Sequence, residues 1–94
     1  MVVVVGEVEL HLPDSQSLKD KRQVVKSLKE RVRNRFNVSI AEVDYHDLWQ
    51  RCAIAIAVVS TTQTHAQEVV STAVDFIERD GRAQLLEFSC EVVM

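Results

Sequence analysis

One stretch near the middle of the chain reads Arg51-Cys52-Ala53-Ile54-Ala55-Ile56-Ala57-Val58-Val59-Ser60. Its alanines alone would suit a helix. From Cys52 onward, however, larger apolar residues alternate with alanine at a strict period of two. Because β-branched residues in such alternation are typical of a strand, we predict a strand over residues 51–60.

The elements before this strand follow from the same reasoning. Residues 2–12 alternate after an apolar start and predict a half-buried strand that ends at Pro13. Ser17 is a suitable N-cap for a helix that we expect to run to about Arg35. Its apolar row is Leu18, Val25, Leu28 and Val32, widened by Val24. Residues 36–44 predict a second strand, and 45–50 a short connector.

A second helix and a last strand are expected after residue 60. Thr61 or Thr62 can cap the helix, and Asp80-Gly81 supplies its C-terminal stop. Residues 84–93 alternate and predict the last strand. Its inward side chains are expected to be those of Leu86, Phe88, Cys90 and Val92.

The element order is therefore β-α-β-β-α-β, within a chain of 94 residues that suits a single domain over 1–94. Two right-handed crossovers on one antiparallel sheet predict the ferredoxin-like α+β two-layer sandwich. The expected strand order across the sheet is 4-1-3-2, with both helices on one face.

Positive charge is concentrated on the first predicted helix. Residues 19–35 hold eight of the eleven Lys and Arg residues and only two acids, a charge of about +6. The remaining 77 residues carry three basic and twelve acidic side chains, about −9. An acidic chain with one basic helix presents an electrically two-sided surface, which favours binding over catalysis.

Five of these cations form an uninterrupted row at helical spacing, one residue along from the apolar row: Lys19, Arg22, Lys26, Lys29 and Arg33. We call this set the basic row. Neighbours three and four apart repel one another, a cost that a bound anion offsets. The row predicts weak, salt-sensitive contact with RNA phosphates. The alternatives are a solvated helix face, salt bridges to the chain's own acids, and an acidic protein partner.

Base-specific readout is not predicted, because the uncovered sheet face offers small apolar residues and acids where an RNA-reading sheet needs aromatic rings. No DNA specificity is indicated either. The apolar part of that face, Val3, Val5, Ala53, Ala55 and Ala57, instead suggests an alternative function as a protein-interaction or homodimer module. The hairpin that carries Trp49 is a second candidate contact for that alternative.

The sequence shows no catalytic residue set, metal-ligand spacing or cofactor motif, so we expect a non-enzymatic protein. His46 lies between Asp44 and Asp47, and a solvated turn explains it better than a metal site or an acid/base pair. Trp49 either covers an edge of the core or marks a contact surface.

The remaining features suggest a location and a redox state. Cys52 and Cys90 are both expected on inward faces, too far apart for a disulfide, as buried free thiols. The apolar run over residues 1–5 lacks a basic flank and is too short for a signal peptide or a membrane span. A cytoplasmic protein without membrane contact is the expectation.

Four segments together resemble the small bacterial YlxP-like family: Ser17–Arg22, Arg33–Val43, Asp47–Arg51 and Val58–Ser60. The resemblance covers almost the whole chain. It implies a ferredoxin-like domain of unknown function, in agreement with the element order. Genes of this family commonly lie in an operon with translation initiation factor two and ribosome-binding factor A. The resemblance therefore implies a bacterial cytoplasmic protein linked to ribosomal RNA or to ribosome-assembly factors.

Overall fold

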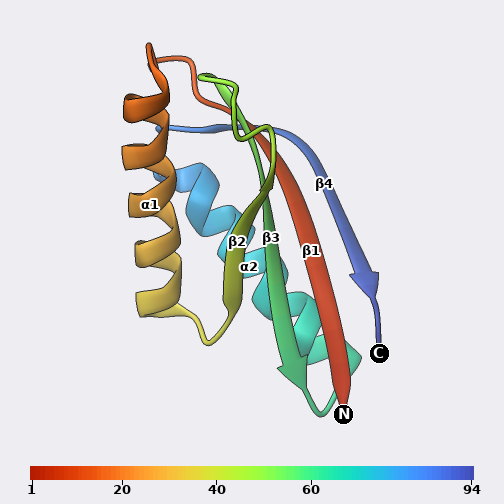
Figure 1. Ribbon diagram of the computed structural model, residues 1–94. Helices are drawn as coiled ribbons and strands as arrows, with labels where there is room; N and C mark the ends of the chain where they lie inside the picture. Colours follow the sequence, from red (N-terminus) through yellow and green to blue (C-terminus); the bar gives the residue numbers. More distant parts are fainter.

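The computed structural model describes all residues from Met1 to Met94 and has the expected β-α-β-β-α-β order (Figure 1). The elements are β1 (Val2–His11), α1 (Leu18–Arg35), β2 (Ser39–Asp44), β3 (Arg51–Ser60), α2 (Gln63–Arg79) and β4 (Gln84–Val92). Neither helix is long and apolar enough to cross a membrane.

The four strands form one antiparallel sheet in the order β2-β3-β1-β4. Read from the other edge, this is the predicted order 4-1-3-2. In Figure 1 α2 crosses behind β3 and β1, whereas α1 lies beside β2 at one edge. The opposite face of the sheet carries no helix, and we call it the open face.

The core lies between the sheet and the helices, as the alternation in the central strands predicts. Val4, Val8 and Leu10 of β1 are fully buried, together with the isoleucines of β3. At Gly6 α2 approaches β1 closely, because a Cβ atom built there would be 2.3 Å from Val70 Cγ1. A glycine at this position allows α2 to rest directly on β1.

Side-chain caps fix where both helices begin. Ser17 Oγ accepts a hydrogen bond from the Asp20 amide at 3.0 Å, and Asp20 Oδ2 accepts one from the Gln16 amide at 3.1 Å. Thr62 Oγ1 accepts from the His65 amide at 3.3 Å. These bonds satisfy amides that have no partner inside the helix.

The second strand begins three residues later than predicted, at Ser39. Phe36 instead ends α1, because its amide still donates to the Val32 carbonyl oxygen at 2.8 Å. Its ring packs edge-to-face on Phe76 of α2, with centroids 5.7 Å apart. The apolar side chain of Phe36 therefore belongs to the contact between the two helices and not to a strand.

The last strand is much more exposed than predicted. Phe88 and Cys90 pair with Val8 and Gly6 and therefore point to the helix side, yet both are exposed. The reason is that α2 lies over the central strands and leaves the β4 edge largely uncovered. The prediction of a buried Cys90 was wrong. Cys52 is buried as expected, and burial raises the pKa of its thiol to about 12.

Candidate functional site

The basic row runs along the outer side of α1, next to the β2 edge of the sheet. Four of its members are exposed and Lys29 is half-buried. None of the five forms an ion pair with a carboxylate of the protein. Arg33 Nη2 donates to the Ile40 carbonyl oxygen at 3.0 Å, which ties the end of the row to β2. The five cations are therefore held side by side on one helix without internal neutralisation.

A sixth cation of α1, Lys21, has the opposite environment. It is 1% exposed and lies in the core row of the helix with Val25 and Leu28, whereas Leu18, which we expected to begin that row, is only half-buried. Its Nζ lies 2.9 Å from Glu42 Oε2 and donates to the Tyr45 carbonyl oxygen. This residue connects α1 to β2 and to the turn that follows it.

Arg31 and Arg35 face α2 on the other side of α1. Arg31 pairs with Asp80, and both guanidinium groups lie over the Phe76 ring, at 5.4 and 5.2 Å from its centroid. Cation–π contact of this kind stabilises the packing of two helices. All three helix cations outside the basic row therefore have identifiable partners within the protein.

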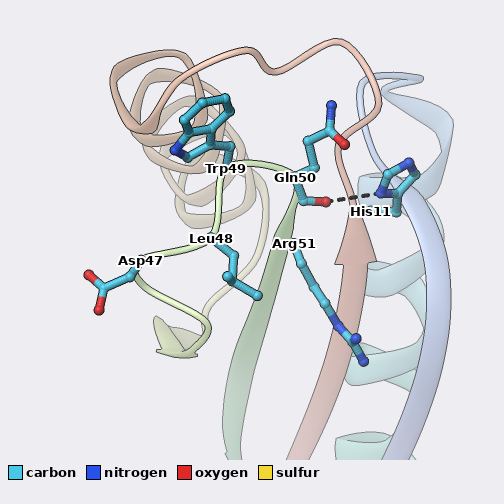
Figure 2. Close-up of a pocket in the computed structure, with 6 residues that line it drawn as sticks. All are labelled: His11, Asp47, Leu48, Trp49, Gln50 and Arg51. Carbon is cyan, nitrogen blue, oxygen red and sulfur yellow. Dashed lines mark hydrogen bonds between the residues drawn. The ribbon is translucent and has the colours of Figure 1, made fainter.

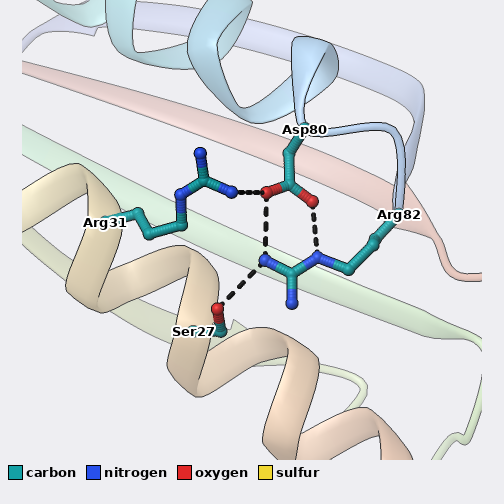
Figure 3. A network of polar contacts seen from close by, with 4 residues as sticks. All are labelled: Ser27, Arg31, Asp80 and Arg82. Carbon is teal, nitrogen blue, oxygen red and sulfur yellow. Dashed lines mark hydrogen bonds and ion pairs between the residues drawn. The ribbon is translucent and has the colours of Figure 1, made fainter.

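Asp80 is the centre of the polar network between the helices (Figure 3). Its side chain is 2% exposed and accepts hydrogen bonds from Arg31 and Arg82. Arg82 Nη2 also donates to Ser27 Oγ at 3.0 Å, which joins the C-terminal end of α2 to the middle of α1. The hydrogen bonds and charge of Arg82, with the charge of Arg31, lower the pKa of the Asp80 carboxyl group.

A second polar network lies on the open face, where the β2–β3 turn folds back. Tyr45 adopts a left-handed backbone conformation with φ of 61°. Its hydroxyl donates to Glu9 Oε1 at 3.1 Å, and Arg51 Nη2 lies 2.6 Å from Glu9 Oε2. The Arg51 guanidinium is 4.5 Å from the Tyr45 ring centroid. The hydrogen bond from Arg51 lowers the pKa of Glu9, and the bond to Glu9 raises the pKa of Tyr45.

This network changes the predicted apolar face. Ala53 lies between Asp44 and Glu9 in the sheet register, so the link from Tyr45 to Glu9 passes over it. Ala53 is accordingly fully buried, although we expected it on the uncovered face. Val3, Val5, Ala55 and Ala57 remain half-buried there.

The end of the open face has an open depression of about 450 Å³ (Figure 2). Its lining residues are His11, Asp47, Leu48, Trp49, Gln50 and Arg51. Trp49 is 55% exposed and Leu48 is 47% exposed, so Trp49 does not cover the core edge. His11 Nδ1 lies 3.0 Å from the Gln50 carbonyl oxygen and closes one side.

His46 is exposed in the adjoining turn. No group of three or more His, Cys, Asp or Glu side chains is arranged to hold a metal ion.

Sequence reasoning missed two of the residues that organise this surface. Lys21 belongs to neither row predicted for this helix, because nothing in the local sequence shows that Glu42 and the Tyr45 carbonyl group lie within its reach in the fold. Asp80 was interpreted only as a helix stop, and its Arg31 partner lies 49 residues away. In the sequence Asp80 lies among other charged residues, Glu78, Arg79 and Arg82, so nothing local marks it as the centre of a network.

Comparison with known proteins agrees with the fold. The de novo designed protein Foldit4 superimposes with a TM-score of 0.59 at 16% identity, covering 95% of this chain and 96% of that one. A designed protein described as having a ferredoxin fold gives a TM-score of 0.56 at 18% identity, covering 100% of this chain and 87% of its own. These similarities confirm the ferredoxin-like architecture.

Sequence comparison identifies the family. The chain is 42% identical over 73 residues to the Uncharacterized protein YlxP of Bacillus subtilis (strain 168), covering 78% of this chain and 79% of that protein. Residues 3–90 match the model of the family described as Protein of unknown function (DUF503). The chain therefore belongs to the DUF503 family, and its resemblance to the YlxP-like proteins is confirmed.

Proposed function

We propose that this chain is a non-enzymatic RNA-binding module that contacts ribosomal RNA through the basic row. The observation that carries the proposal is the division of the α1 cations. Lys21 and Arg31 pair with carboxylates and Arg35 lies over the Phe76 ring, whereas no member of the basic row has a carboxylate or aromatic partner and only Arg33 has a backbone one, the Ile40 carbonyl oxygen. Unpaired cations held in one line favour an external anion.

The dimensions of the row suit a nucleic-acid backbone. From Lys19 to Arg33 the helix rises about 21 Å at 1.5 Å per residue. Neighbouring members are about 5–6 Å apart, and successive phosphates of one strand are separated by about 3.4 Å along the axis of a DNA duplex, a spacing of the same order. The row can therefore contact several phosphates at once. No aromatic side chains accompany it for base stacking, so we expect binding that tolerates different sequences.

The operon association of the YlxP-like family supports ribosomal RNA as the target class and the bacterial cytoplasm as the location. Ribosome-assembly factors are the alternative target. In that case the basic row would bind an acidic surface of the partner protein.

The test compares two variants with the same change in net charge. Lys26→Gln/Lys29→Gln/Arg33→Gln removes three charges from the basic row. Gln63→Glu/Thr64→Glu/Ser71→Glu adds three negative charges at exposed positions of α2. Fluorescence anisotropy with a labelled ribosomal RNA fragment measures affinity as the salt concentration is raised.

We expect log K of the wild type to fall with log salt at a slope of about −3.5 to −4.5, since each of the five cations contributes about 0.7 to 0.9 when it contacts a phosphate. The first variant should bind about tenfold or more weakly at low salt, with a slope smaller in magnitude by about two. The second should keep the wild-type slope. Equal effects of the two variants would mean that net charge alone matters, and no slope in the wild type would exclude phosphate binding.

A further inference from the structure

The open face carries three acids that the protein does not neutralise. Glu7, Glu87 and Glu91 are exposed and form no ion pair. The strand register places Glu7 opposite Ser89 and Glu91 opposite Val5, so all three project from the same side of β1 and β4. We call these three residues the acidic strip. Glu9 is beside them but is already paired with Arg51.

The acidic strip is continuous with the depression at the hairpin. Glu7, Glu9, Glu87 and Ser89 line a shallow groove of about 210 Å³. Arg51 lines the depression and bonds to Glu9 of the groove, so the two hollows meet at that ion pair. A chain that leaves the depression can therefore pass directly over the acids.

The depression offers an apolar anchor point. Trp49 and Leu48 are about half exposed although both are large and apolar, and they lie beside His11 and Arg51. Tryptophan and arginine are the side chains that most often dominate the energy of protein interfaces. A volume of about 450 Å³ accommodates an apolar side chain.

Charge selects the occupant of this surface. Nucleic acid is repelled by the acidic strip. Face-to-face packing with a second copy would bury unpaired carboxylates, which is costly. A polypeptide segment with basic residues would form ion pairs with these carboxylates. An apolar residue beside those charges would cover the exposed surface of Trp49 and Leu48.

We propose that the open face binds an extended basic polypeptide segment, with one apolar side chain in the Trp49 depression and its lysines or arginines over the acidic strip. In an extended chain, side chains on one face recur about every 6.6 Å. Glu87 and Glu91, four residues apart in β4, are separated by about 13 Å on the same scale. Glu7, opposite Ser89, lies at the level midway between them. Basic residues at every second position of the peptide therefore match the three acids. This surface is distinct from the basic row and would serve a protein partner.

Trp49 is the only tryptophan of the chain and reports directly on the depression. The probe is a synthetic peptide of alternating lysine and serine headed by one leucine. A second peptide has serine in place of that leucine, and a third has glutamate in place of every lysine. Tryptophan emission is followed as each peptide is added at low salt.

We expect the leucine-headed lysine peptide to shift Trp49 emission to shorter wavelengths with saturation. The serine-headed peptide should bind about tenfold more weakly, and the glutamate peptide should not bind. Glu7→Gln/Glu87→Gln/Glu91→Gln should weaken binding about tenfold, since each exposed pair contributes little alone and three act together. Leu48→Ala should reduce the preference for leucine over serine.

The matched control is Glu68→Gln/Asp75→Asn/Glu78→Gln, which removes three exposed acids from α2. It should bind the lysine peptide like the wild type. Equal binding by the acidic-strip variant and the wild type would overturn the proposal. So would a response to the glutamate peptide, or the absence of any saturable response to the leucine-headed peptide.

Discussion

Lys21 belongs to the most basic segment of the chain and is nevertheless a core residue. Its ion pair is the only polar contact of the buried Glu42 Oε2 atom. Lys21→Met should therefore cost about 3–5 kcal/mol in the free energy of unfolding, because a carboxylate remains buried without its cation. Lys21→Met/Glu42→Met should be more stable than the single variant, since both charges are gone. Urea denaturation measures both.

The control for this prediction is Lys26→Met in the exposed basic row, where the change should stay within about 0.5 kcal/mol. If Lys21→Met behaves like Lys26→Met, the Lys21–Glu42 pair does not contribute to stability.

Asp80 should make stability depend on pH in the acidic range. Its two arginine partners lower the pKa of the folded carboxyl group below its unfolded value. The stabilisation is therefore complete above about pH 4 and is lost as pH falls through the folded pKa. Asp80→Asn should destabilise by about 1–2 kcal/mol at pH 7, a modest figure because both arginines are partly exposed to solvent.

Urea denaturation between pH 7 and about pH 2 tests this, because the difference between wild type and Asp80→Asn should shrink as the wild-type carboxylate becomes protonated. Asp75→Asn, at an exposed position of α2, should have nearly the same free energy of unfolding as the wild type both at pH 7 and at about pH 2. If the difference in the free energy of unfolding between wild type and Asp80→Asn stays constant with pH, the Asp80 carboxylate is not the source of the pH dependence.

At the scale of elements, the contact between α2 and β1 depends on Gly6. Gly6→Ala places a methyl group 2.3 Å from Val70 Cγ1, so the helix must shift, at a cost of about 1–3 kcal/mol. Adding Val70→Ala removes the clashing atom, so the double variant should lose about 1 kcal/mol less than the sum of the singles. Thermal or urea unfolding measures this coupling.

Gly81 is the matched control, since its φ of +86° strains any other residue while no atom lies within 4 Å of an added Cβ. Gly81→Ala should also destabilise, but Val70→Ala should not relieve it. Purely additive effects of Gly6→Ala and Val70→Ala would exclude close packing at this point.

The elements could be predicted because their periodicities are local. The alternation in residues 51–60 and the caps at Ser17 and Thr62 are visible in the sequence and determine the order of the fold. The predictions that were wrong concern side chains whose environment depends on how the elements pack against each other. Cys90 alternates correctly but is exposed because α2 packs mainly on β1 and β3 and covers little of β4. Phe36 is in phase with a strand but packs between the helices.

The basic row was also predictable from helical spacing alone, whereas its lack of internal partners was not. The sequence left open whether acids elsewhere would neutralise it. The fold directs Asp80 to Arg31 and Glu42 to Lys21, and leaves the row without a carboxylate partner. The division between paired and unpaired cations is a property of the tertiary structure.

The whole molecule separates its charges across a thin body. The basic row lies on the helix layer and the acidic strip on the open face of a structure whose Cα extents are 42 × 21 × 17 Å. At physiological salt the Debye length is about 8 Å, so the two surfaces should act independently. At about 0.01 M salt it is about 30 Å, longer than the molecule is thick, and the acids should then oppose RNA binding.

Neutralising the acidic strip tests this coupling without a cationic peptide that could itself bind RNA. Glu7→Gln/Glu87→Gln/Glu91→Gln should bind the RNA fragment about three- to tenfold more tightly than the wild type at about 0.01 M salt. The difference should fall below about twofold at about 0.15 M, where screening separates the faces. Fluorescence anisotropy at both concentrations gives the comparison. Equal RNA binding by this variant and the wild type at about 0.01 M salt would mean that the acidic strip does not oppose RNA binding, because unscreened acids should repel phosphates.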